Sequence, residues 1–222
     1  MSDVLKKIRY KGYTIQICAD SCPESPRDWD NLGTMACYHS RYTNFGDKDH
    51  GYPSSDYESL GAIAKAIEKD TGGAFILPVY MMEHSGISLS TDATYFRAFD
   101  AAGWDWGTLG LIFVAKSKVR EEWKVKRISP QLRRKVLDSL VAEVEAYSQY
   151  VNGEVYGYII TKDTVSDEEV EDGEYDDDEE VNDEVEEVDS CWGMFGWEYT
   201  EQEAKAFIDF EIEQAAKEPV AA

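Results

Sequence analysis

One segment of this chain cannot form a packed core, and it limits where folded structure can lie. Residues 163–189 contain 17 Asp and Glu among 27 residues and no Lys or Arg. Their like charges repel one another, and five valines and one tyrosine bury too little apolar surface to offset the entropy of ordering. Residues 1–162, in contrast, carry 20 basic and 21 acidic side chains. The formal charge of −23 therefore comes mainly from an insertion, which we place at residues 163–187.

Two interpretations of this insertion stay open. In the first it is a solvated, disordered loop with no role of its own. In the second its carboxylates imitate the phosphates of a nucleic-acid backbone and attract a basic partner. A calcium loop is not expected, because the run lacks the Asp-x-Asp-x-Asp-Gly order with Glu at the twelfth position. The candidate partner-binding residues of the insertion are Glu168, Glu169, Glu171, Asp172, Asp176, Asp177, Asp178, Glu179, Glu180, Asp183 and Glu184.

The residues on either side of the insertion have the character of strands. Glu154–Ile160 is rich in β-branched and aromatic residues, and Val188–Gly193 alternates apolar with small polar residues. We therefore expect a β-hairpin whose turn is enlarged by the acidic run. Pro78 would confine its own strand to a sheet edge or a bulge. Further strands are expected at residues 13–18, 33–39, 75–82, 87–91 and 109–115, with a tight turn at 83–86.

Capping signals predict three helices and a shorter fourth. Ser55–Glu58 and Thr200–Glu203 have the pattern of capping boxes, and Ser129-Pro130 supplies an N-cap with a first-turn proline. The short helix is expected from Ser117 to Trp123. Strands and helices are interspersed without strict βαβ order, which predicts an α+β fold with a mainly antiparallel sheet and three to four helices. We expect a single domain over residues 1–222 that carries the acidic insertion within a hairpin.

Residues 116–135 form the most basic segment of the chain, with nine Lys and Arg. Arg133, Arg134 and Lys135 lie in the first turns of the predicted long helix, where positive charge opposes the helix dipole. A solvated face is the ordinary explanation for such a run. Two functional explanations compete with it: a nucleic-acid patch, or an internal dock for the acidic insertion.

Four residues have a spacing that suggests zinc: Cys18, Cys22, Cys37 and His39. Structural zinc sites more often use two pairs whose members are separated by two to four residues. Cys18 also falls in a predicted strand, where a buried thiol is common. We therefore expect free thiols and neither a metal nor a cofactor, with zinc as the alternative.

The sequence carries no motif of a known catalytic centre. His84 and Ser85 are adjacent, but adjacent side chains on a turn rarely point at one another, and no Gly-x-Ser-x-Gly motif or phosphate-binding glycine loop occurs. No catalytic residue is assigned. A small hydrolase built around His39, His84 and nearby aspartates is the enzymatic alternative.

Two loops place tryptophan beside aspartate, at residues 26–33 and 102–107. Such tryptophans either fill the core while the aspartates cap turns, or they stay exposed and anchor a basic protein surface. The functional interpretation selects Trp104, Asp105 and Trp106 as partner-binding residues.

Five short motifs occur in order within residues 10–200: Ser25–Met35, His84–Ser90, Trp104–Gly107, Val155–Tyr158 and Asp189–Gly193. In these motifs the chain resembles a family of uncharacterised proteins from tailed bacteriophages and mobile elements. The family has no established activity, so the resemblance transfers no site residue. It implies a phage product in the cytoplasm of a bacterial host, where small acidic proteins often inhibit host defence.

We therefore expect a non-enzymatic phage inhibitor that binds a host nucleic-acid-handling defence complex, such as a restriction or CRISPR assembly, through acidic mimicry of nucleic acid. The partner would carry a basic nucleic-acid-binding surface. Direct binding to nucleic acid is not expected, nor is contact with a membrane, because no run of 18 apolar residues occurs. The alternatives are the small phage enzyme and a nucleic-acid binder that uses residues 116–135.

Overall fold

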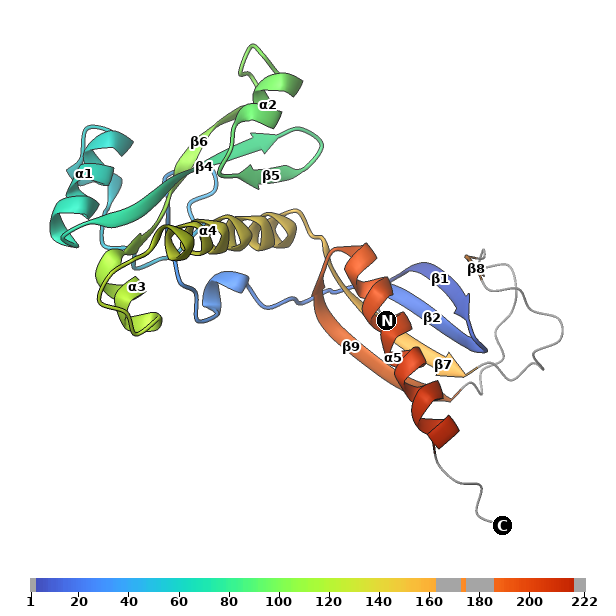
Figure 1. Ribbon diagram of the computed structural model, residues 1–222. Coiled ribbons are helices and arrows are strands. Elements are labelled where there is room, and N and C mark those ends of the chain that lie inside the picture. Colours follow the sequence, from blue (N-terminus) through green and yellow to red (C-terminus); the bar gives the residue numbers. More distant parts are fainter. Residues whose placement is uncertain (1–2, 163–172, 175–185, 218–222) are drawn as a thin grey trace. The chain divides into compact units, whose positions relative to one another are not determined.

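The computed structural model describes residues 3–162, 173–174 and 186–217. The chain folds into two compact units (Figure 1). The terminal unit is built from the described residues of Met1–Glu24 and Gly153–Ala222, and the central unit is Ser25–Asn152. Each unit combines an antiparallel sheet with α-helical structure, so the predicted α+β class is confirmed. The single domain expected over residues 1–222 stays a prediction.

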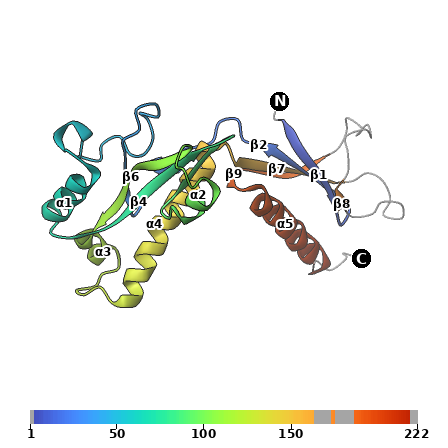
Figure 2. The same ribbon diagram turned by 90° about the horizontal axis from the view of Figure 1, so that it is seen from above.

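The terminal unit is a sheet with one helix, α5 (Trp197–Lys217), lying along it (Figures 1 and 2). Its strands are all antiparallel and follow the order β8-β1-β2-β7-β9. The core between sheet and helix contains Ile15, Ile17, Ile160, Ala204 and Ile208. The strands are β1 (Val4–Tyr10), β2 (Tyr13–Ala19), β7 (Val155–Lys162), β8 (Gly173–Glu174) and β9 (Glu187–Phe195).

The predicted hairpin around the acidic insertion is confirmed, because β7 and β9 pair from Val155↔Phe195 to Thr161↔Glu187. The ring of Trp192 on β9 lies where a Cβ on Gly157 of β7 would be, so the glycine makes room for the tryptophan. Eleven acidic partner-binding candidates, from Glu168 to Glu184, lie outside the described residues. Their predicted role stays a prediction.

The central unit has a four-stranded sheet with helices packed on both faces. Side chains of β6 alternate between the two faces: Ile112 and Val114 join the cluster with α4, and Leu111 and Phe113 join the cluster with α1. In sheet order the strands are β3 (Thr34–Cys37), β6 (Trp106–Ala115), β4 (Ala74–Glu83) and β5 (Ile87–Ser90). The helices are α1 (Leu60–Asp70), α2 (Thr94–Phe99), α3 (Lys116–Glu122) and α4 (Pro130–Val151), with 3₁₀ turns at Pro26–Asp28 and Ser54–Asp56.

The strand that contains Pro78 is an inner strand, although the proline itself obeys the expected restriction. β4 pairs with β6 from Ala74 to Met82, whereas β5 pairs only with Tyr80–Glu83. Pro78 therefore lies beyond the reach of β5, and the register shift between Val79 and Tyr80 follows it directly. A proline without an amide N–H is accepted at such a position.

Both predicted capping boxes are wrong, whereas the N-cap of the long helix is confirmed. Ser129 accepts a hydrogen bond from the amide of Leu132, as expected of the residue that precedes Pro130. For α1 the N-cap is Ser59, and Ser55 belongs to the preceding 3₁₀ turn. Thr200 lies inside α5, where its buried hydroxyl donates to the carbonyl of Gly196. Hydroxyl residues bond backbone groups in turns and within helices as well as at caps.

Candidate partner-binding site

A single aspartate organises the loop that precedes β6. The Asp100 carboxylate accepts hydrogen bonds from four successive backbone amides, those of Ala102, Gly103, Trp104 and Asp105, over 2.5–3.1 Å. These hydrogen bonds lower the pKa of Asp100 because they stabilise its charged form, and the bond from the Asp105 amide contributes most. The indole N–H of Trp106 donates to the Asp100 carbonyl at 2.8 Å. We call residues 100–107 the Trp104 loop.

The two tryptophans of this loop have different surroundings. Trp104 is 87% exposed, the largest value among the exposed large hydrophobic residues of the described chain. Trp106 is half-buried, with its ring edge-on to Tyr80 at 6.2 Å and 5.9 Å from the guanidinium of Arg97. Only Trp104 therefore presents its ring as the exposed anchor that was expected of both.

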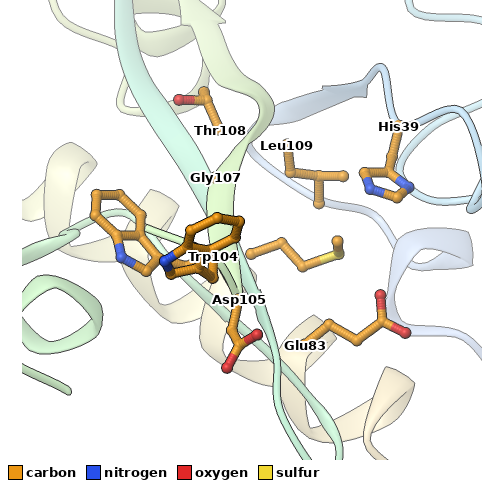
Figure 3. Close-up of a pocket in the computed structure, with 9 residues that line it drawn as sticks. His39, Glu83, Trp104, Asp105, Gly107, Thr108 and Leu109 are labelled. Carbon is orange, nitrogen blue, oxygen red and sulfur yellow. The ribbon is translucent and has the colours of Figure 1, made fainter. Parts of the chain in front are cut away.

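Trp104 borders a groove of about 390 Å³ in which carboxylates face the solvent (Figure 3). Asp105 comes from the loop, Glu83 from the end of β4, and His39 from the segment after β3. Glu83 accepts hydrogen bonds from the Arg41 guanidinium at 2.6 Å and from the Tyr42 hydroxyl at 2.8 Å. These contacts hold the Glu83 carboxylate in place in the wall of the groove that Trp104 also lines.

Two histidines, His39 in the groove wall and His84 bonded to Asp105, contact polar neighbours, but neither completes a nucleophilic centre. His84 Nδ1 lies 2.9 Å from the Asp105 carboxylate, and its ring packs edge-on to Phe99. His39 Nδ1 accepts hydrogen bonds from the amides of Arg41 and Tyr42. In the part of the chain that the structure describes, no hydroxyl or thiol is bonded to either ring. Nucleophilic catalysis needs such a contact in addition to a His–Asp pair.

The proposed zinc ligands are divided between the two units. Cys18 and Cys22 belong to the terminal unit, and Cys37 and His39 belong to the central unit. These three cysteines and Cys191, the fourth in the sequence, are free thiols. The described residues contain no group of three His, Cys, Asp or Glu that could hold a metal ion. Burial, with the charge of Asp47, raises the pKa of Cys37 to about 12, which keeps this thiol protonated.

The other tryptophan loop, residues 25–33, is tied into the core by Arg27. The guanidinium forms two hydrogen bonds to the Asp47 carboxylate, at 2.7 and 2.8 Å, and one to Glu143 on α4 at 3.0 Å. The Glu143 carboxylate also accepts hydrogen bonds from the backbone amides of Leu32 and Gly33. Burial opposes the charge of Arg27, but these partners outweigh it and raise its pKa. Sequence reasoning missed Asp100, Asp47 and Glu143, which carry the polar structure of both loops.

No family model, curated protein or solved structure matches the chain at significant similarity. None of the described helices is long and apolar enough to cross a lipid bilayer.

Proposed function

We propose that the chain is a non-enzymatic binding protein that attaches to a basic surface of a protein partner through the Trp104 loop. The observation that carries this proposal is the 87% exposure of Trp104 on a loop held by four hydrogen bonds from backbone amides to the Asp100 carboxylate. Tryptophan is the residue type most enriched among side chains that dominate binding energy. A loop that is already ordered loses little conformational entropy on binding, which favours affinity.

The charge around Trp104 supports a basic partner. Asp105 and Glu83 line the same groove, and both carboxylates are more than a third exposed, although Arg41 offsets the charge of Glu83 and leaves Asp105 as the main acidic group. Carboxylates at the rim of an aromatic anchor attract Lys and Arg and repel acidic surfaces, which gives selectivity. The acidic insertion would add long-range attraction and so raise the association rate without fixing the contact.

The finer proposal is that the partner is a host defence complex with a nucleic-acid-binding surface, and that the chain inhibits it in the bacterial cytoplasm. This part is supported by the resemblance to phage proteins and by the charge of the insertion. The eleven acidic partner-binding candidates of the insertion would compete with nucleic acid for that surface, while Trp104 would supply the specific contact.

Capture from a bacterial host lysate tests the proposal when matched variants are used. We expect immobilised wild type and Trp29→Ala to retain the same protein, and Trp104→Ala to lose it. With the purified partner, Trp104→Ala should raise the Kd at least about 30-fold, which corresponds to ~2 kcal/mol. Association should slow by about tenfold or more as salt is raised. Equal retention by both tryptophan variants would overturn the proposal.

One observation favours the enzymatic alternative: the contact of 2.9 Å between His84 and Asp105. This pair could act as a general base for a water molecule at the groove. If it does, His84→Ala should abolish the biological activity of a folded protein. The binding proposal predicts that His84→Ala keeps activity nearly intact and that inhibition saturates at a fixed ratio to the target.

A further inference from the structure

A second groove of the central unit is lined by positive charge. It lies where α3, the connection after it and the start of α4 meet, and its volume is about 570 Å³. Phe75 of β4 contributes an apolar wall, and Ile128, Ser129 and Pro130 come from the connection and the first turn of α4. We call this the basic groove, after its five cationic side chains, Lys116, Arg120, Lys126, Arg127 and Arg133.

The cations of the basic groove lack acidic partners within the described residues. None of the five forms an ion pair there, and no Asp or Glu lines the groove. Elsewhere in the same unit, Arg27 pairs with Asp47 and Glu143, and Arg41 pairs with Glu83. The basic groove therefore holds charge that the described parts of the protein do not neutralise.

Two of these cations converge on one aromatic ring. The ammonium of Lys116 lies 5.8 Å from the centre of the Phe75 ring, and the guanidinium carbon of Arg133 lies 6.0 Å from it. The two positions are 17 residues apart in the sequence, so the fold brings like charges together. Each is attracted by the ring, and both would be further stabilised by an anion between them.

The distribution of charge favours an extended anion over a single small one. Residues 116–135 carry nine Lys and Arg against two Glu, a net charge of +7. The groove cations come from α3, the connection and α4, so their reach exceeds one phosphate group. The successive phosphates of a nucleic-acid backbone pair with such a row of Lys and Arg side chains.

The surroundings of the groove argue against a membrane and against reading of bases. Among the described residues from 105 to 162, no large hydrophobic side chain is strongly exposed, whereas membrane-surface binding needs exposed apolar groups beside the cations. Phe75 is only 8% exposed, so it offers no face on which a base could stack. Contacts from this groove would reach phosphates, which position a strand without selecting its sequence.

We propose that the basic groove binds the phosphate backbone of a nucleic acid. This inference uses other residues and another ligand than the Trp104 proposal, and it departs from the expectation that direct nucleic-acid binding does not occur. The formal charge of −23 opposes the approach of a polyanion. The complex should therefore be weak at physiological salt, with a Kd on the order of 10⁻⁴–10⁻⁶ M, and tighter at low salt.

The test is a fluorescence-anisotropy titration of a labelled single-stranded oligonucleotide of mixed sequence with the full chain. The groove variant carries Arg120→Gln, Arg127→Gln and Arg133→Gln, three exposed side chains. The matched control carries Lys48→Gln, Lys65→Gln and Lys69→Gln, which are also exposed, remove the same charge and lie outside the groove. The groove variant should raise the Kd about tenfold or more at low salt and reduce the slope of log K against log salt by about 2.

Several outcomes decide the proposal. Unchanged binding by the control and by Trp104→Ala supports it and separates it from the Trp104 proposal. Absence of binding at low salt overturns it, and so does an equal loss in groove variant and control. Preference for vesicles of phosphatidylserine or for polyglutamate over the oligonucleotide also overturns it. If the triple variant fails to fold, Arg127→Gln alone should still reduce the salt slope by about 0.7.

Discussion

The two tryptophan loops of the central unit have similar sequences and opposite constructions. In residues 25–33 the carboxylates come from outside the loop, since Asp47 and Glu143 reach Arg27 and the loop amides from the following segment and from α4. In the Trp104 loop the carboxylate is internal, because Asp100 binds the four amides that follow it. The first construction ties a loop to the core, and the second orders a loop that the core does not hold.

This difference decides what each tryptophan can do. Trp29 is 46% exposed above a network whose central guanidinium is only 5% exposed. Trp104 is 87% exposed above a loop that keeps its shape without covering the ring. A loop held by its own hydrogen bonds can expose a side chain without loss of core packing. In the Trp104 loop, exposure of the binding side chain is therefore independent of the stability of the fold. Exposure and stability are coupled in residues 25–33.

Removing the charge of Arg27 should have the largest effect on stability. We expect Arg27→Met to lower the free energy of unfolding by about 3–5 kcal/mol, because the largely buried Asp47 and Glu143 carboxylates would keep their backbone hydrogen bonds but lose the cation that balances their charge. Arg41→Gln, which breaks the exposed pair with Glu83, should cost less than about 1 kcal/mol. Urea denaturation measures both values. Similar costs for the two variants would show that the Arg27 network is not a buried structural element.

Substitution of the glycine that ends each loop should also cost more unfolding free energy in residues 25–33 than in the Trp104 loop. A Cβ on Gly33 would lie 2.5 Å from Leu140 of α4 and 3.0 Å from Ile112, whereas a Cβ on Gly107 would meet nothing within 4 Å. Gly33→Ala should therefore cost about 1–3 kcal/mol through overpacking. Gly107→Ala should stay within about 0.5 kcal/mol of wild type. The reverse order in thermal or urea unfolding would contradict the comparison.

Local signals in the sequence were sufficient for much of the fold. Ser129-Pro130 and the apolar stripe of Val136, Leu140 and Val144 predict α4, and these three side chains are buried. The β7–β9 hairpin follows from β-rich segments on both sides of the acidic run. β1 was missed because Val4–Tyr10 contains Lys6, Lys7 and Arg9 and buries only Ile8, so its pattern is that of a solvated segment.

The candidate site was predictable only in part. The pattern of Trp beside Asp selected Trp104 and Asp105, and the structure places both at one groove. It could not distinguish exposed Trp104 from half-buried Trp106, since Tyr80 and Arg97 are contributed by β4 and α2. Arg27 and Glu143 are 116 residues apart, and no local spacing connects such positions. The partners of Asp100 lie within five residues of it, so its role leaves a weak signal in the sequence: an Asp followed closely by Gly103, as is typical of a turn.

Removing the carboxylate of Asp100 should disturb the Trp104 loop and leave the rest of the fold intact. In Asp100→Ala the indole N–H resonance of Trp106 should move and the loop amides should exchange faster, while Asp28→Ala in the other loop should change neither. Because the pKa of Asp100 is lowered in the folded protein, its contribution is complete above the ordinary Asp value of about 3.9 and is lost as pH falls through the lower folded value. A resonance that stays constant on acidification would contradict this role.

Truncation of Trp104 should have the smallest effect on stability and the clearest effect on binding. Its ring is almost fully exposed, so Trp104→Ala should change the free energy of unfolding by no more than about 0.5 kcal/mol. Trp29→Ala should cost more, ~1 kcal/mol, because about half of that ring is covered. Partner binding should show the opposite order, with a large loss for Trp104→Ala and little for Trp29→Ala. Urea unfolding and titration of the captured partner give both quantities for both variants. If Trp104→Ala destabilised the fold as much as Trp29→Ala, the ring would be part of the core, and the separation between a loop that holds the structure and a loop that binds would fail.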